Sequence, residues 1–181
     1  RKASTGFGSS CLYGLWLRSL TGLCDVFERD DDKMRCSDNH QAMSTATTIK
    51  FLQQPTSNAW VEQALANLDV ILLDHSHCER KAAGVALNLM FRYPSNTKLV
   101  RSLTAIAQEE LEHFEQVNQI LEARGIPLAP LAGPPYGARL NQHIRPQEPD
   151  RLLDTLLVCG LIEARSHERL GLLGNHCPDL Q

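Results

Sequence analysis

The chain has 181 residues, of which 43% are hydrophobic and 22% are charged, and its formal net charge is −3. That length is sufficient for one medium-sized domain with a sizeable core. No apolar run approaches the roughly 20 residues of a membrane span, so the composition excludes a membrane protein. It also excludes an overall basic field, so a nucleic-acid partner would have to meet a local basic patch.

The first 42 residues show no sustained hydrophobic period and contain an acidic run at residues 30–32. Their short apolar stretch is interrupted by Arg18, and no clear cleavage site follows it, so a signal peptide is disfavoured; the acidic run disfavours a transit peptide. We therefore predict that residues 1–42 are a disordered or artefactual leader. The folded domain is predicted to cover residues 43–181, beginning at Met43.

None of the six cysteines forms a C-x-x-C pair, which disfavours a structural zinc site. Cys78 and Cys159 lie inside helical patterns, where buried free thiols are common. This cysteine usage is typical of a reducing compartment, and we expect the protein to be cytoplasmic.

Residues 58–92 repeat apolar side chains at alternating steps of three and four, the pattern of one long amphipathic helix. Ser57 or Asn58 can cap its start, and Pro94 ends it. The predicted buried face consists of Leu65, Leu68, Leu72, His75, Glu79, Ala82, Ala86 and Leu89.

A second helix is predicted to begin near residues 96–97 and to end at Gly125, a residue typical of the position after a helix. Its predicted buried face consists of Leu99, Leu103, Ile106, Glu110, His113, Val117 and Ile120. A third helix is predicted to begin near Pro149 and to end at Gly174, or at Pro178 at the latest. Its predicted buried face consists of Leu152, Leu156, Cys159, Glu163, Ser166, Leu170 and Leu173.

Each predicted buried face carries a glutamate near its middle: Glu79, Glu110 and Glu163. Taken singly, such a glutamate is more often a residue at the rim of the core or an ion-pair partner. His75 and His113, taken singly, are more often hydrogen-bonded core histidines than metal ligands. Burying one ionised carboxylate costs several kcal/mol, however. Three glutamates at similar depth therefore indicate that they belong to one shared site.

The order of these residues matches the carboxylate di-iron bundle, in which two helices each give a glutamate and two each give Glu-x-x-His. Glu110 and His113 share one helix face and can reach the same ion, and carboxylates and imidazole both suit iron. We therefore predict an all-α, ferritin-like four-helix bundle with two non-haem iron ions. The fourth helix, with its own Glu-x-x-His, is not found before Gln181, so the domain is predicted to be incomplete at its C-terminus.

The chain resembles the MiaE-type tRNA hydroxylases over about residues 51–181, in the segments "LLDHSHCERKAAGVALNLMFRYP", "AQEELEHFEQVNQILEARGIPL" and "EPDRLLDTLLVCGLIEARSHERL". The resemblance implies an O2-dependent monooxygenase that hydroxylates the isopentenyl group of 2-methylthio-N6-isopentenyladenosine next to the tRNA anticodon. Its electrons would come from an external donor protein. Carried over by motif, the iron ligands would be Glu79, Glu110, His113 and Glu163, with Glu110 bridging the two ions.

Residues 125–149 are rich in proline and glycine and form a longer connection than is common in compact domains. The simplest interpretation is the crossover that such a bundle needs between its second and third helices. Four residues nevertheless form a local positive cluster: Arg139, His143, Arg145 and Arg151. Because an aromatic ring can stack on a base, we predict that Tyr136, Arg139 and Arg145 contact the tRNA.

Two other functions fit the same pattern. A ferritin-like protein that oxidises iron or handles peroxide would use the same four ligands but would need no surface for nucleic acid. A non-catalytic helical fragment that packs against a partner would use the apolar groove of an incomplete bundle.

Overall fold

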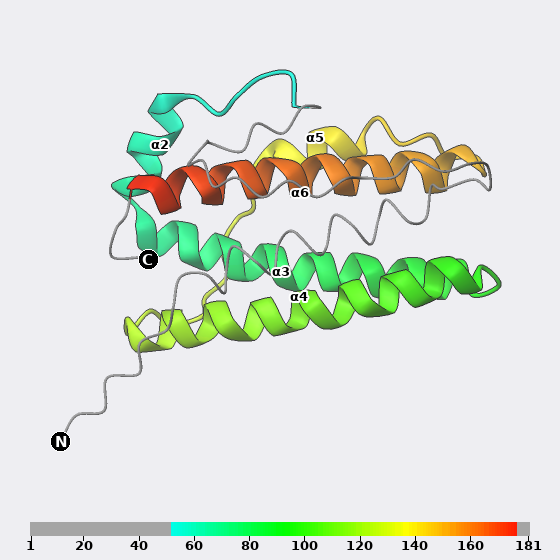
Figure 1. The fold of residues 1–181 in the computed structure, drawn as a ribbon, viewed down its shortest axis with the longest axis horizontal. Coiled ribbons are helices and arrows are strands. Elements are labelled where there is room, and N and C mark those ends of the chain that lie inside the picture. The colour runs from blue at the N-terminus through cyan, green and yellow to red at the C-terminus, as the bar shows by residue number, and fades with distance from the viewer. Residues whose placement is uncertain (1–51, 177–181) are drawn as a thin grey trace, which may run out of the picture.

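The computed structural model describes residues 52–176, and these residues form helices and connections without a strand, as predicted. The helices are α2 (Asn58–Leu65), α3 (Leu68–Arg92), α4 (Thr97–Ala123), α5 (Pro135–Asn141) and α6 (Asp150–His176). The three long helices, α3, α4 and α6, lie side by side, and α5 covers part of α6 (Figure 1). No helix in this part of the chain is long and apolar enough to cross a membrane. The predicted leader, residues 1–42, lies outside the described residues.

The predicted single helix over residues 58–92 is wrong, because the structure divides it into α2 and α3 at Asn67. Asn67 has a non-helical backbone conformation, and its side-chain amide donates to the Gln63 carbonyl at 2.8 Å. Asparagine favours such breaks because its side chain competes for nearby backbone groups. The break lets α2 turn away from α3 and pack against the last part of α6 (Figure 1). The predicted cap is confirmed: the Ser57 hydroxyl accepts from the Trp60 amide at 3.3 Å.

The helices α3 and α4 form a tightly packed antiparallel pair. Asn96 caps the start of α4 by accepting from the Leu99 amide at 3.1 Å, close to the predicted start. Deep in the pair, the Ser76 hydroxyl donates to the side-chain carbonyl of Asn118 at 2.7 Å. The core cluster joins this pair to α6 through the buried Leu156, and the partly buried Leu152 of α6 packs against it. The members of the cluster are Ala86, Leu89, Leu99, Leu103, Ala107 and Leu156.

The crossover between α4 and α6 begins at Gly125, whose φ of 71° is in the left-handed region that favours glycine. His77 on α3 anchors the crossover by donating from Nε2 to the Ala129 carbonyl at 2.8 Å. Its other ring nitrogen accepts from Arg80 at 2.9 Å, which defines the tautomer. The crossover also contains α5, which the sequence pattern did not predict.

Helix α6 continues past Gly174 to His176, so the prediction that Gly174 ends it is wrong. A glycine inside a helix costs only about 1 kcal/mol relative to alanine, and packing can outweigh that cost. Leu173 beside it is buried, and the His176 ring bonds to the Leu172 carbonyl at 2.7 Å. The long α6 therefore presents Glu163 near its middle.

Gly84 and Gly125 allow a test of how backbone conformation limits the choice of residue. A Cβ built on either glycine meets no atom within 4 Å, so steric contact does not interfere. We expect Gly125→Ala to lower the free energy of unfolding by about 1 kcal/mol, because alanine disfavours positive φ. Gly84→Ala, in the exposed interior of α3, should raise it by about 0.5–1 kcal/mol. Urea denaturation measures whether each variant raises or lowers the free energy of unfolding. A change of the same sign in both variants would contradict this account.

Candidate metal centre

Three of the four predicted ligands converge between α3 and α4. Glu79 is 2% exposed, and Glu110 and His113 are each 3% exposed. Each offers one ligand atom, and these atoms all lie within 4.8 Å of one another. Glu110 and His113 lie one turn apart on α4, and Glu79 faces them from α3. The geometry suits a metal ion, and the role of these residues as ligands remains a prediction.

The two carboxylates and two histidines form a short chain of contacts. His113 Nδ1 lies 3.4 Å from Glu79 Oε2 and 3.9 Å from Glu110 Oε2. His75 Nδ1 lies 3.2 Å from the other oxygen of Glu79. Each oxygen of Glu79 therefore faces a different histidine, one on its own helix and one on α4. His75 therefore contacts a predicted ligand.

The pKa values of these groups depend on one another. Burial raises the pKa of Glu79 to about 8, and the neighbouring charge of Glu110 adds to the shift. Burial alone would also raise the pKa of Glu110, but interactions with His113 and Glu79 outweigh it and lower that pKa. Burial opposes protonation of His113, yet the two carboxylates raise its pKa to about 10. Without a metal ion, Glu79 and His113 therefore hold protons at neutral pH.

Glu163 approaches this group from α6. Burial raises its pKa to about 8, and the negative charge of Glu110 adds to the shift. The positive charge on His113 acts in the opposite direction. Glu163 thus lies near enough to interact electrostatically with both residues on α4, although it does not belong to the compact group of three ligand atoms.

The donor set fits the predicted iron ions. Three carboxylates and one imidazole are hard and borderline ligands of the kind that iron accepts. Among residues 52–176, no lysine or arginine forms an ion pair with Glu79, Glu110 or Glu163. Bound dications could displace the protons on Glu79 and His113 and offset the buried negative charge.

Cys78 and Cys159 are free, half-buried thiols on α3 and α6, as predicted. Burial raises the pKa of each thiol to about 11, and the charge of Glu163 contributes to both shifts. A thiol with a raised pKa is a poor nucleophile, so these residues are structural neighbours of the centre. The other four cysteines lie outside the described residues.

The predicted tRNA-contacting residues lie on the crossover. Arg139 is exposed on α5, and Tyr136 is half-buried, near enough to Arg169 to affect its pKa. Arg145 donates to Asp154 from Nε at 2.8 Å and from Nη2 at 2.7 Å. This contact lowers the pKa of Asp154 to about 2, and Arg145 also pairs with an oxygen of Asp150. The charge of Arg145 is therefore locally compensated, and its contact with tRNA remains a prediction.

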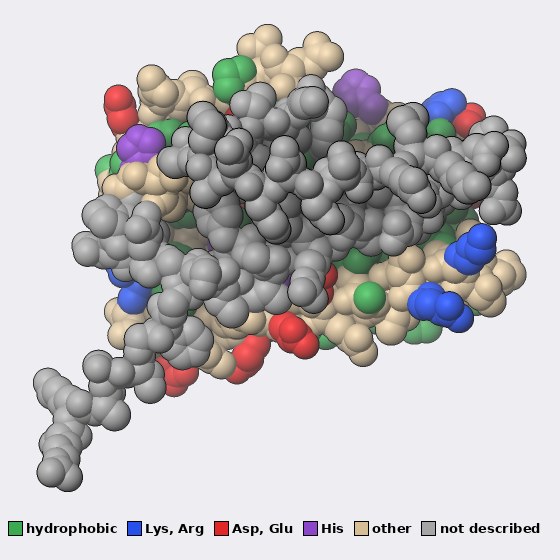
Figure 2. Space-filling view, viewed as in Figure 1, with side chains coloured by type: hydrophobic (Ala, Val, Ile, Leu, Met, Phe, Trp, Pro, Cys, Tyr) green, Lys and Arg blue, Asp and Glu red, His purple; other side chains and the backbone are tan. Residues whose placement is uncertain are grey.

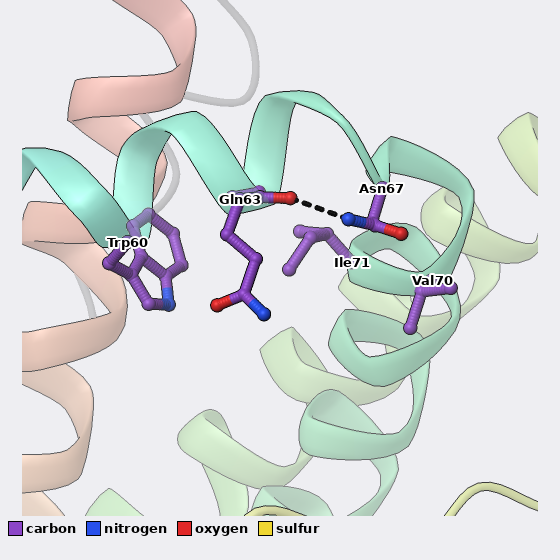
Figure 3. A pocket seen from close by; sticks show the side chains of 6 residues that line it. Trp60, Gln63, Asn67, Val70 and Ile71 are labelled. Carbon is purple, nitrogen blue, oxygen red and sulfur yellow. Dashed lines mark hydrogen bonds between the residues drawn. The ribbon is translucent and has the colours of Figure 1, made fainter.

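A surface pocket of about 270 Å³ lies at the α2–α3 break, which the sequence pattern did not predict (Figure 3). It is lined by Trp60, Gln63, Ala64, Asn67, Val70 and Ile71. Arg169 lies 4.7 Å from the centre of the Trp60 ring. Because no ionisable side chain lines the pocket, it is not a candidate for the catalytic site.

Long helices with a buried Glu–Glu–His group at their contact define a ferritin-like helical protein with a group that could hold a metal ion. Residues 43–181 match the family model described as tRNA-(MS[2]IO[6]A)-hydroxylase (MiaE), and the chain belongs to this family. This membership confirms the resemblance inferred from the three sequence segments.

Two curated relatives and one solved structure show how far the similarity extends. The chain is 44% identical over 126 residues to a protein of Pseudomonas putida named tRNA 2-(methylsulfanyl)-N(6)-isopentenyladenosine(37) hydroxylase. It is 29% identical over 174 residues to a protein of Salmonella typhimurium with the same name. These matches cover 70% and 69% of this chain, and 62% and 64% of the relatives, so the chain spans less than two thirds of their length.

The solved structure is described as "Protein 43 with aldehyde deformylating oxygenase activity from Synechococcus". It is 55% identical in sequence, has a TM-score of 0.71, and is matched over 73% of this chain and 67% of its own. The likeness confirms the predicted helical bundle.

The raised pKa values predict how the stability of the metal-free chain depends on pH. Folding raises the pKa of Glu79 and Glu163 to about 8, so the folded state binds more protons than the unfolded state up to that pH. Their stabilising contribution is complete at low pH and is lost as the pH rises through 8. The raised pKa of His113, about 10, acts in the same sense. The free energy of unfolding should therefore fall by several kcal/mol between pH 6.5 and pH 9, with roughly 2 kcal/mol from each of the three groups.

Urea denaturation in the presence of a chelator measures this fall. The window starts at pH 6.5 because the lowered pKa of His75, about 4, acts in the opposite sense below it. Glu163→Gln should remove about a third of the fall, because one of the three groups with a raised pKa is lost. The exposed Glu122→Gln should leave it unchanged. A flat profile in the parent chain would contradict the electrostatic description of the site.

Proposed function

We propose that this chain is the helical catalytic part of a tRNA-modifying monooxygenase. It would hydroxylate the isopentenyl group of 2-methylthio-N6-isopentenyladenosine next to the anticodon. The observation that carries the proposal is the buried convergence of Glu79, Glu110 and His113 in a chain of the MiaE family. The names of the two curated relatives support tRNA as the substrate.

The proposed cofactor is a pair of non-haem iron ions, which Glu79, Glu110, His113 and Glu163 would hold. Bound iron, with O2 and electrons from an external donor protein, would supply the oxidant that an unactivated allylic C–H bond requires. No side chain is basic enough to remove such a proton, so acid–base catalysis alone could not achieve the reaction.

The chain's own residues prepare the site for this chemistry. His75 contacts one oxygen of Glu79 at 3.2 Å and so restricts the orientation of that carboxylate. Glu79 and His113 would lose their protons when cations bind. The buried side chains of Ala83, Ala107 and Val117 neighbour these ligands along the two helices and help to exclude water.

The alternatives are less well supported. A ferritin-like protein that handles iron or peroxide would share the ligands, but the curated relatives are named as tRNA hydroxylases. A non-catalytic fragment does not account for the buried carboxylates. The tRNA substrate, together with the free thiols of Cys78 and Cys159, supports a cytoplasmic location.

Analysis of tRNA nucleosides tests the proposal directly. The chain is loaded with ferrous iron and incubated with O2, a chemical reductant and tRNA that carries the isopentenyl nucleoside. Mass spectrometry of the digested tRNA should show the gain of one oxygen atom on that nucleoside. A parallel assay with a long-chain aldehyde tests the activity named for the Synechococcus protein. Aldehyde turnover without nucleoside oxidation, by a chain that retains iron, would contradict the proposal.

Substitutions at the centre should separate ligands from supporting residues. Glu110→Gln should reduce both iron binding and nucleoside hydroxylation by at least 100-fold, because it removes the carboxylate proposed to bridge the ions. His75→Ala should weaken iron binding by about 10–100-fold, the usual effect of losing a group that orients a ligand. The exposed Glu122→Gln is the control and should retain parental values. Ferrous titration and the nucleoside assay measure these effects.

A further inference from the structure

Charge is strongly separated along the α3–α4 pair. Residues 84–108 contain three cations, Arg92, Lys98 and Arg101, and no aspartate or glutamate. Residues 109–122 contain five glutamates and no lysine or arginine. Figure 2 shows the result: basic side chains gather at the end where α3 and α4 join, and acidic side chains follow the later part of α4. The net charge of −3 conceals this basic end.

The three cations are exposed, and they have no acidic partner among the residues that the structure describes. Other arginines do have one: Arg145 pairs with Asp150 and Asp154. Glu148 lies near the end of α3, but there it accepts from the Tyr93 hydroxyl and forms no ion pair with the three cations. The described residues therefore do not compensate the positive field at this end.

An exposed aromatic ring lies among these cations. Phe91, the neighbour of Arg92, is 86% exposed and is the most exposed of the large hydrophobic residues in the described part of the chain. Proteins that bind single-stranded or looped RNA combine cations, which contact phosphates, with aromatic rings, on which bases stack. We name Phe91, Arg92, Lys98 and Arg101 together the basic tip.

The basic tip is far from the metal centre but is rigidly connected to it. Lys98 precedes Glu110 by 12 residues on α4, and Phe91 follows Glu79 by 12 residues on α3. At 1.5 Å per residue, each lies about 18 Å from the centre along its helix. A small substrate at the carboxylates could not reach the tip, whereas an RNA with one nucleoside at the centre could.

We propose that the basic tip is the docking surface for the RNA whose modified nucleoside enters the metal centre. The inference rests on the proposed function and locates the partner's binding surface. Arg92, Lys98 and Arg101 contact phosphates, and Phe91 stacks on an unpaired base. Repulsion from the glutamates on the later part of α4 disfavours other orientations of the RNA.

Binding of a tRNA anticodon stem-loop at several salt concentrations tests the cations. The variant Arg92→Gln/Lys98→Gln/Arg101→Gln should raise Kd at least tenfold at 0.1 M salt. It should reduce the slope of log Kd against log salt by about 2–3, because up to three phosphate contacts are lost. The matched control, Gln53→Glu/Gln108→Glu/Gln142→Glu, changes the net charge equally at exposed positions and should stay within about threefold of the parent.

The ring is tested separately. Phe91→Ala should weaken binding about fivefold or more without changing the salt slope, and Phe91→Trp should retain it. Leu87→Ala, which removes another exposed apolar side chain of α3, serves as the control and should have no effect. Every variant should retain parental iron content and thermal stability, since all these side chains are on the surface.

The outcomes distinguish this inference from the proposed function. If the triple variant binds RNA with the parental affinity and salt slope while the parent hydroxylates tRNA, the docking surface is wrong and the function stands. If Arg139→Gln/Arg145→Gln abolishes binding and the triple variant does not, the RNA docks on the crossover instead. If the iron-loaded parent binds no RNA at any salt concentration, both proposals fail.

Discussion

The structure depends on burying acidic side chains among apolar ones. Glu79 and Glu110 are buried in the α3–α4 pair, between the apolar cluster that contains Leu103 and the buried Val117. In the metal-free state, protons on Glu79 and His113 reduce the cost of this arrangement. The same groups can lose these protons to solvent when cations bind. Burial therefore both costs free energy when no metal is bound and prepares the site to bind metal.

The helices contribute unequally to this site. The α3–α4 pair is closely packed and supplies three of the predicted ligands, together with His75, which contacts one of them. Helix α6 reaches the pair through side chains such as Leu156 and adds Glu163. The crossover is held to α3 by the bond from His77 to Ala129. A rigid pair with a separate third helix is suited to holding ions whose ligands come from different segments.

Charge has opposite uses inside the bundle and on its surface. Inside, carboxylates that have no lysine or arginine partner within residues 52–176 form the proposed site for cations. On the surface, Arg92, Lys98 and Arg101 form a site for an anionic polymer. Both features depend on leaving charges without local compensation, which is unfavourable for stability and useful for binding. Where the chain does compensate a charge, as Asp154 does for Arg145, the pair stabilises the start of α6 instead.

Periodicity by itself determined the three long helices and the glutamate at the middle of each, because a buried helix face repeats every 3.6 residues. It also identified His113, since positions three apart share a face. Periodicity did not predict the break at Asn67 or the continuation past Gly174, since local preferences there are weak and packing decides them. The buried positions also shifted by one residue in places, from Ile106 to Ala107. Only the tertiary structure decided that Glu79 meets His113 across two helices and that Arg145 is paired. It also decided that the basic tip has no acidic partner among the described residues, because periodicity assigns residues to helix faces and does not specify which side chains meet.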